Sequence, residues 1–283
     1  MLKYTDRSPW TRLLWVAIAL LIPAGIEAAP TTAPSDSAAT PMVRIPSGCF
    51  ALGSQHNYSD ERPRHRVCLS RFQLDRTEVT VAAYARCVKA GRCTPAIGYQ
   101  GRHPTRRYCN AGHAGFGRHP INCVTWAQAR AYCAWRHKRL PTEAEWERAA
   151  RGTAPGPYLF GRTAPTCALA VIAKVVKGRF VPGCGQGSTL PVGSRPRDRS
   201  REGVLDLTGN VSEWAADPFE LGYYKHSPEH DPRGPKHSRT HAVRGCHFRC
   251  PPGSRLLHRT ARMYSNTWDP TIGFRCARGR HGT

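Results

Sequence analysis

Twelve cysteines in a chain of 283 residues constrain the fold more than any other feature of this sequence. Ahead of them lies a segment with the order of a secretory signal: Lys3, Arg7 and Arg12, then the apolar run 13–22, then small residues, with cleavage expected after Ala28. An apolar run that short does not span a bilayer, which takes about 20 residues. We therefore expect a secreted or periplasmic protein with no transmembrane span after signal removal, and cysteines that are paired.

Several cysteines lie where a bridge would close a local structure. We expect one bridge across neighbouring strands, one at the end of a helix, one closing a long loop and one across an irregular segment. The corresponding pairs are Cys49 and Cys68, Cys87 and Cys93, Cys109 and Cys123, and Cys167 and Cys184.

Composition separates the chain into three parts: a signal peptide (1–28), a linker rich in Pro, Ala, Ser and Thr (29–41) and one folded domain (42–280). The formal charge is +23, and removing a signal with three basic and two acidic residues leaves +22. This balance favours anionic partners, such as an anionic envelope surface. No run of five Lys or Arg occurs and aromatics do not alternate with basic residues, so specific nucleic-acid binding is not predicted.

Secondary structure is predicted to be modest. Strand-like runs 43–45, 50–52 and 66–69 precede a helix from Thr80 to Lys89. Two further helices begin at capping boxes, and two closing strands are expected near the end of the chain. The capping boxes are Thr125 with Gln128 and Thr142 with Glu145, and the closing strands are 242–245 and 272–276. Helices clustered in the middle of a loop-rich chain indicate one α+β domain.

The stretch 205–214, LDLTGNVSEW, combines two carboxylates with a turn glycine. Asp206 and Glu213 offer side-chain oxygens, and Gly209 allows a turn that directs the carbonyls of Gly209 and Val211 to the same point, an oxygen set suited to Ca²⁺. The alternative is a tight turn in which Asp206 and Asn210 bind local backbone donors.

Motifs far apart in the sequence together resemble one family, the sulfatase-modifying-factor domain of formylglycine-generating enzymes. The resemblance covers most of 42–280, and it implies a loop-rich fold related to C-type lectins, bound calcium and internal disulfides. The motifs are 78–80 (EVT), 139–147 (RLPTEAEWE), 209–214 (GNVSEW), 243–245 (VRG) and 273–276 (GFRC).

Carried over by position, the resemblance implies one calcium site formed by Asp206, Gly209, Val211 and Glu213. A second family calcium site would fall on 167–171, CALAV, which lacks the expected Asn. The resemblance also implies a disulfide between Cys133 and Cys276.

The family oxidises a substrate cysteine, as in sulfatases, to formylglycine with O₂ and a copper ion held by two cysteines. Two thiolates suit soft copper(I). Counted from Arg244, Cys250 matches the first copper cysteine, whereas the second position falls near Ser254. Cys246 is an additional cysteine that could complete an altered copper site with Cys250 or form a local disulfide with it. His247 is a further candidate as metal ligand or acid/base group, and solvation alone is its alternative.

The same region departs from the family in its surroundings. Thr271 replaces a pocket Asn, His258 carries the same alternatives as His247, and Arg262 matches an arginine near the family's site.

Two hypotheses of different classes follow. The first is an exported oxidoreductase of formylglycine-generating type, with a cysteine-bearing protein or peptide as substrate. The second is a catalytically silent, calcium-stabilised binding module. A non-haem iron enzyme is a third hypothesis, but no His-rich ligand set with a defined spacing is found. The thiol state of Cys246 and Cys250 separates the first two hypotheses.

Overall fold

The protein is described from a computed structural model, which covers residues 40–55, 59–98, 104–152, 163–254 and 259–279. Contacts divide the chain into residues 1–37 and 38–283, and all described residues belong to the second unit. The predicted signal and nearly all of the predicted linker lie outside the described residues. Among the described residues, no helix has the length and apolar character needed to cross a membrane.

The N-terminal strands pair only partly as expected. β2 (Gly48–Leu52) pairs antiparallel with β3 (His65–Leu69), which places Cys49 directly opposite Cys68. β1 (Met42–Ile45) instead pairs with β4 (Phe72–Asp75), a strand that was not predicted, and β4 also pairs with β11 (Ala277–Gly279). Strands from the start and the end of the domain thus lie in one sheet, with the order β1-β4-β11.

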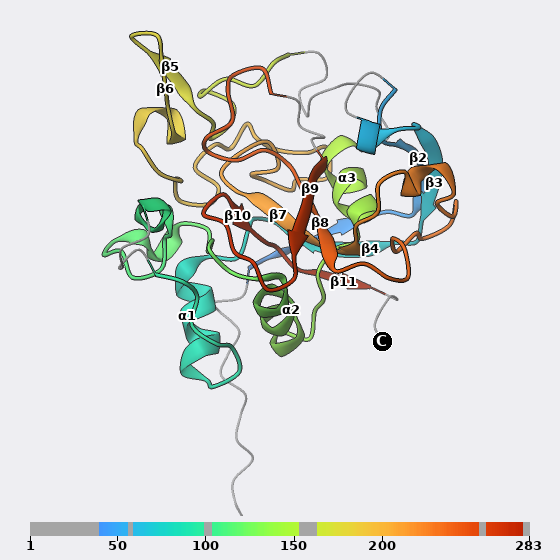
Figure 1. Ribbon diagram of the computed structural model, residues 1–283, viewed down its shortest axis with the longest axis horizontal. Helices are drawn as coiled ribbons and strands as arrows, with labels where there is room; N and C mark the ends of the chain where they lie inside the picture. The colour runs from blue at the N-terminus through green and yellow to red at the C-terminus, as the bar shows by residue number, and fades with distance from the viewer. Residues whose placement is uncertain (1–39, 56–58, 99–103, 153–162, 255–258, 280–283) are drawn as a thin grey trace, which may run out of the picture. The chain divides into compact units, whose positions relative to one another are not determined.

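The three predicted helices are confirmed, and their N-terminal caps are the predicted threonines. Thr80 caps α1 (Val81–Lys89), and capping boxes begin α2 (Trp126–Trp135) and α3 (Glu143–Arg151). A cap side chain satisfies backbone N–H groups that have no partner inside the first turn. Figure 1 shows α1 and α2 near one another and α3 beside the small β2–β3 sheet.

The central sheet has the order β10-β7-β8-β9. β7 (Ser212–Pro218) begins inside the carboxylate-rich stretch, and it was not predicted as a strand. β8 (Thr240–Arg244) and β9 (Arg259–Tyr264) follow in antiparallel order, whereas β10 (Ile272–Gly273) runs parallel to β7. The second predicted closing strand is therefore limited to two residues.

Two apolar clusters pack against this sheet. The first joins α3 to the N-terminal strands around the buried Trp146, and the second joins α1 and α2 to β7 around the buried Trp214. The mixture of helices and strands in one loop-rich domain confirms the predicted α+β class.

All twelve cysteines form disulfides. The four local pairs confirm the spacing argument, and the bridge that the family resemblance implied joins α2 to the segment after β10. The last bridge is the local alternative for the copper candidates. The pairs are Cys49–Cys68, Cys87–Cys93, Cys109–Cys123, Cys167–Cys184, Cys133–Cys276 and Cys246–Cys250.

A hairpin was also missed. The segment that looked irregular in sequence contains a two-stranded hairpin, β5 (Lys174–Val176) and β6 (Arg179–Val181). The hairpin lies at the upper left of Figure 1.

Candidate functional site

The turn after β8 is anchored by a buried arginine. Arg244 donates to Glu143 (NH1 to Oε1, 3.0 Å) and to Glu147, both on α3, and its guanidinium lies over the ring of Trp146 at 5.6 Å. Gly245 follows with φ +82°, and a Cβ there would lie 2.9 Å from the Trp146 ring. A glycine is therefore needed at the point where the chain turns away from α3.

The turn leads directly into the pair that the sequence predicted as copper and catalytic residues. Cys246 and Cys250 are joined by a disulfide with Cα atoms 6.0 Å apart, and both are buried. The backbone N–H of His247 donates to Cys250 Sγ at 3.2 Å. The structure thus brings the two predicted cysteines together, in their oxidised form.

Two neighbouring segments hold this turn through backbone hydrogen bonds. The N–H of Ala173 donates to the Cys250 carbonyl (2.9 Å), and the N–H of Gly183 donates to the Phe248 carbonyl (2.7 Å). Cys246 and Cys250 share one apolar cluster with Ala170 and Ile172, and Cys167 packs against it. The second disulfide, Cys167–Cys184, holds the same segments together.

The rim of the site is aromatic and basic. The buried ring of Phe248 lies 5.9 Å from Tyr108, and the guanidinium groups of Arg107 and Arg249 lie over Tyr108 at 4.8 and 5.2 Å. His247 is half-buried, and its Nδ1 accepts from the Arg249 N–H at 3.2 Å.

Two of the positions that depart from the family lie in the described part of the chain. The Ser254 hydroxyl donates to the Pro251 carbonyl at 2.8 Å. Thr271 donates to Asp269 through both its N–H and its hydroxyl. His258 lies outside the described residues, and Arg262 lies on β9 with its side chain outside them.

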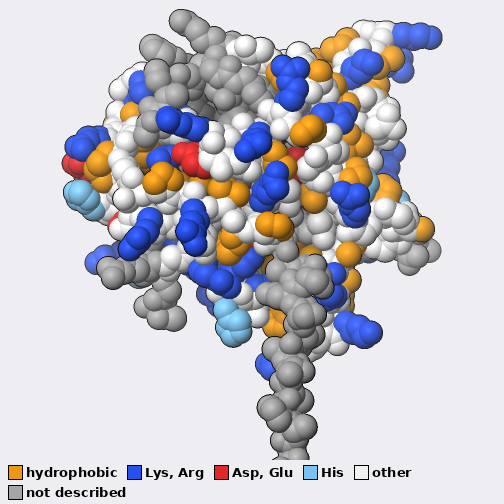
Figure 2. Space-filling model, turned by 180° about the vertical axis from the view of Figure 1, so that it is seen from behind, with side chains coloured by type: hydrophobic (Ala, Val, Ile, Leu, Met, Phe, Trp, Pro, Cys, Tyr) orange, Lys and Arg blue, Asp and Glu red, His pale blue; other side chains and the backbone are white. Residues whose placement is uncertain are grey.

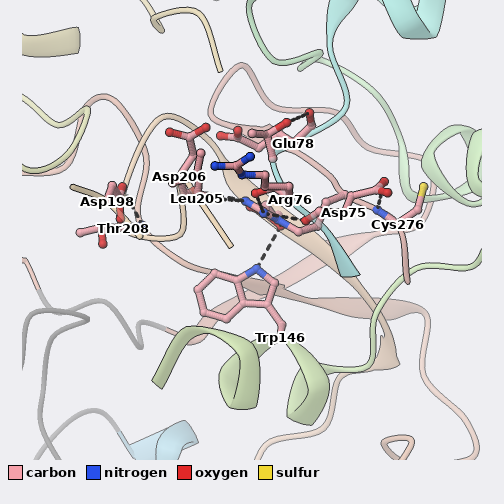
Figure 3. A network of polar contacts seen from close by, with 12 residues as sticks. Asp75, Arg76, Glu78, Trp146, Asp198, Leu205, Asp206, Thr208 and Cys276 are labelled. Carbon is pink, nitrogen blue, oxygen red and sulfur yellow. Dashed lines mark hydrogen bonds and ion pairs between the residues drawn. The ribbon is translucent and has the colours of Figure 1, made fainter. Parts of the chain in front are cut away.

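A second polar network lies behind β7, where the sequence predicted calcium. Glu213 is fully buried and accepts two bonds from Arg275, Nε to Oε2 and NH2 to Oε1, both 2.7 Å. Trp146 donates its indole N–H to Glu213 Oε2 at 3.0 Å (Figure 3). Both oxygens of Glu213 therefore already face a cation.

Asp206 and Glu78 lie beside this ion pair and have oxygens without an N–H donor among the described residues. Asp206 Oδ2 accepts from the Gly193 N–H at 2.6 Å, whereas its Oδ1 and both oxygens of Glu78 are buried with no N–H donor, and the two carboxyl groups interact with each other. Figure 3 shows the two carboxyl groups on the same side of the network, opposite Trp146. Burial and then the charge of Asp206 raise the pKa of Glu78 well above its usual value, and burial also raises the pKa of Asp206.

The loop between Asp206 and Glu213 has a strained backbone conformation. Asp206 and Asn210 both adopt left-handed backbone conformations, with φ +57° and +63°. A Cβ on Gly209 would lie 2.3 Å from the Val171 carbonyl oxygen, and that oxygen accepts from the Asn210 N–H at 2.8 Å. Val211 follows as a buried residue just before β7. The Asn210 carbonyl accepts from the Phe248 N–H at 2.9 Å, so this loop is joined directly to the Cys246–Cys250 turn.

Among the residues the structure describes, no group of three or more His, Cys, Asp or Glu side chains is arranged to hold a metal ion. The predicted calcium ligands are two side chains, Asp206 and Glu213, and two backbone carbonyls. The absence of a group of three or more such side chains from the described residues therefore does not test that prediction.

Three residues of the network were not predicted as site residues. Glu78 and Arg275 stood in the recognised motifs, but no local pattern showed that they meet at Glu213. Asp198 is buried near Asp206, and burial together with that charge raises its pKa to about 8. Only chain folding brings these residues together.

Taken together, the site is a buried cysteine pair held on a scaffold of disulfides and buried ion pairs, in a loop-rich domain of the C-type-lectin-like class. Residues 27–280 match the Sulfatase-modifying factor enzyme 1-like domain, and the chain belongs to this family. The match begins ahead of the predicted linker, so the boundary at Met42 stays a prediction.

Relatives and solved structures agree with this family. A formylglycine-generating enzyme from Streptomyces coelicolor is 34% identical over 280 residues, covering 83% of this chain and 88% of the relative. The structure of PvdO from Pseudomonas aeruginosa matches with a TM-score of 0.69 and 28% identity, over 84% of this chain and 93% of the other. Treponema denticola variable protein 1 shares the fold, with a TM-score of 0.65 and 21% identity over 84% and 94%.

Proposed function

We propose that this protein is an exported enzyme of formylglycine-generating type, and that the Cys246/Cys250 pair is its reactive centre. The observation that carries the proposal is the position of the pair, which begins directly after the anchored Arg244-Gly245 turn and lies below an aromatic, basic rim. Six disulfides support export to an oxidising compartment. The substrate would be a cysteine in a protein or peptide.

The donor chemistry of the pair fits copper(I) only after the disulfide is reduced to two thiolates. Bound there, copper would supply the one-electron chemistry that O₂ needs in order to react with a thiol. Converting a cysteine side chain to an aldehyde with release of H₂S removes two electrons, whereas reducing O₂ to water takes four. A thiol reductant must therefore supply the other two, and such a reductant also opens Cys246–Cys250.

The chain's own residues hold and tune the pair. The buried contacts of Arg244 fix the turn, and the N–H of His247 points at Cys250 Sγ, where it would stabilise a thiolate. Arg249 adds positive charge at the rim. Tyr108 and Phe248 form an apolar wall beside the pair.

The calcium site remains part of the proposal. Asp206 offers a buried oxygen with no N–H donor among the described residues, and Gly209 and Val211 lie on the same strained loop. Glu213 would contribute the oxygen lone pairs that Arg275 leaves free. Ca²⁺ would stiffen the loop that joins β7 to the cysteine turn.

The test uses the full exported chain, reduced under anaerobic conditions, with free thiols counted by mass spectrometry. We expect one copper(I) to bind in competition with a chromophoric chelator, and a cysteine-containing peptide to gain an aldehyde under O₂. Cys250→Ser should lower both copper affinity and aldehyde yield by at least about 100-fold, because one thiolate is lost. The control variant Cys87→Ser/Cys93→Ser removes a distant disulfide and should keep both activities.

One observation favours the second function, the calcium-stabilised binding module. Cys246–Cys250 is a disulfide inside an apolar cluster, and this state contains no thiolate for copper. If the reduced, folded protein binds no copper(I) and forms no aldehyde, the oxidase proposal is wrong and the binding module replaces it.

A further inference from the structure

The β5–β6 hairpin carries an unusual concentration of exposed apolar side chains. Val175, Val176 and Phe180 are 52, 40 and 60% exposed, and they account for most of the large hydrophobic side chains exposed in the described part of the chain. Val175 lies directly opposite Phe180 in the register of the hairpin, so the two side chains share one face. Such a cluster on a surface indicates a contact with another molecule or a membrane.

The hairpin is presented on a rigid base. Below it, the N–H of Cys184 donates to the Ile172 carbonyl at 2.7 Å, and the Cys167–Cys184 disulfide closes the same segment. Bonds from Ala173 and Gly183 attach both ends of the hairpin to the Cys246–Cys250 turn. The base of the hairpin is therefore held to the cysteine turn.

Basic residues surround the apolar ones. Lys174 and Arg179 are exposed on the two strands, and Lys177 stands in the turn between them with φ +47°, followed by Gly178 with φ +73°. Two consecutive left-handed residues form the tight hairpin turn that matches the twist of paired strands. Lys177 is consequently placed at the tip.

No acidic residue offsets this charge nearby in the sequence. Neither 148–197, which contains the hairpin, nor 232–268, which contains its supporting turn, has any Asp or Glu. Figure 2 shows Lys and Arg side chains spread over the rear face with few acidic ones, and apolar and basic side chains together on the projection at its upper right, where the hairpin of Figure 1 comes to lie.

The acidic residues of the domain are mostly internal. Of the seventeen Asp and Glu that follow the predicted signal, ten are buried, whereas only three Arg and no Lys are buried among the described residues. The surface is therefore more cationic than the formal charge of +23 suggests. The charge complement of such a surface is an extended anionic one.

We propose that the β5–β6 hairpin is a membrane-docking element that inserts Val175 and Phe180 among the headgroups of an anionic lipid surface, with Lys174, Lys177 and Arg179 on the lipid phosphates. A projecting two-stranded tip with side chains exposed on both faces fits a fluid interface, whereas peptides are usually held in grooves. Lysine and arginine next to anionic headgroups add to the binding of apolar side chains. This docking would hold the cysteine turn close to the envelope surface.

The experiment is sedimentation of the full exported chain with vesicles. We expect binding to vesicles of phosphatidylglycerol and phosphatidylcholine at 50 mM salt, at least tenfold weaker binding to phosphatidylcholine alone, and a clear decrease in binding at 500 mM salt, where the Debye length is only a few Å. Val175→Ser/Phe180→Ser should lower the partition coefficient about tenfold, and Lys177→Glu about fivefold or more.

Matched controls lie elsewhere on the surface. Leu221 is 56% exposed and Lys89 is exposed on α1, so Leu221→Ser and Lys89→Glu change the same chemistry without touching the hairpin. Both should change the partition coefficient less than twofold. A Phe180→Trp variant should show quenching by brominated lipid beyond that of the native tryptophans, which reports insertion directly.

Equal loss of binding in the hairpin and control variants would mean that general charge alone attracts the protein, and the proposal would be wrong. It would also be wrong if the wild type did not sediment with anionic vesicles while hairpin variants lost activity on a cysteine peptide. That second result would make the hairpin a contact for a protein substrate. The sedimentation results do not depend on whether the reduced protein binds copper(I), so the two proposals fail separately.

Discussion

Arg275 shows how single buried charges organise this domain. Its guanidinium binds Glu213 at two points and also donates to the carbonyls of Asp75 and Leu205 (3.1 and 2.9 Å). One side chain thus joins β7, β4 and the start of the carboxylate-rich stretch. Its burial is compensated because every bond ends on an acceptor.

Removing this arginine should be costly. Arg275→Met leaves Glu213 buried without its cation, and we expect a loss of about 3–5 kcal/mol in the free energy of unfolding. Urea denaturation followed by tryptophan fluorescence measures it. The exposed Arg278, three residues further on, is the matched control, and Arg278→Met should change stability by less than about 0.5 kcal/mol. Equal effects of the two variants would contradict the structural role of Arg275.

His241 should give the domain a defined acid sensitivity. It is buried and stacked on Trp126 at 3.8 Å, and burial together with Arg130 lowers its pKa from 6.5 to about 4. Below about pH 6.5 the unfolded chain takes up a proton on this histidine that the folded state does not. The free energy of unfolding is therefore highest above about pH 6.5 and falls toward pH 4.

The expected loss over this window is about 1–3 kcal/mol. His241→Gln should remove that part of the pH dependence, whereas His237→Gln, which changes an exposed histidine, should keep it. Urea midpoints measured every half pH unit test this. A profile for His241→Gln that is parallel to the wild type would show that His241 does not titrate in this way.

At the scale of elements, the disulfides differ in the length of chain that they close. Cys133–Cys276 joins residues 143 positions apart, whereas Cys87–Cys93 joins residues only 6 apart. In the chain-entropy account the longer loop gains more stability, about 5 against about 2 kcal/mol.

We therefore expect Cys133→Ala/Cys276→Ala to lower the melting temperature far more than Cys87→Ala/Cys93→Ala. Calorimetry of the two double variants makes the comparison. Similar decreases would indicate that native packing around each bridge, not loop length, sets its contribution.

The helices and the β5–β6 hairpin show which elements can be predicted locally. The helices could be placed because Thr80, Thr125 and Thr142 cap them, and a cap is a contact over three residues. β4 was missed because its partners, β1 and β11, lie far away in the sequence. The hairpin was missed because both of its faces are exposed, so it lacks the alternation of a half-buried strand.

At the scale of the whole molecule, calcium should stabilise the domain as a ligand of the folded state. With free Ca²⁺ at about 100 times its dissociation constant, the gain is about 2.7 kcal/mol. Thermal melts with calcium and with a chelator measure it. Asp206→Asn should reduce the gain, and Glu220→Gln, which changes an exposed carboxylate, should not. If calcium does not change the melting temperature of the wild type, the proposed calcium site is wrong.

The helix caps, the local disulfides, the α+β class and the family could be predicted from the chain, because each of these depends on residues close together or on motifs in a fixed order. Tertiary structure alone decided that Cys246 and Cys250 are bonded to each other and that Glu78 and Arg275 meet Asp206 and Glu213. It also decided that the acidic residues are mostly inside and the basic ones outside. The physical reason is that burial and the pairing of charges are set by segments up to 200 residues apart, and no local pattern records which of them will meet.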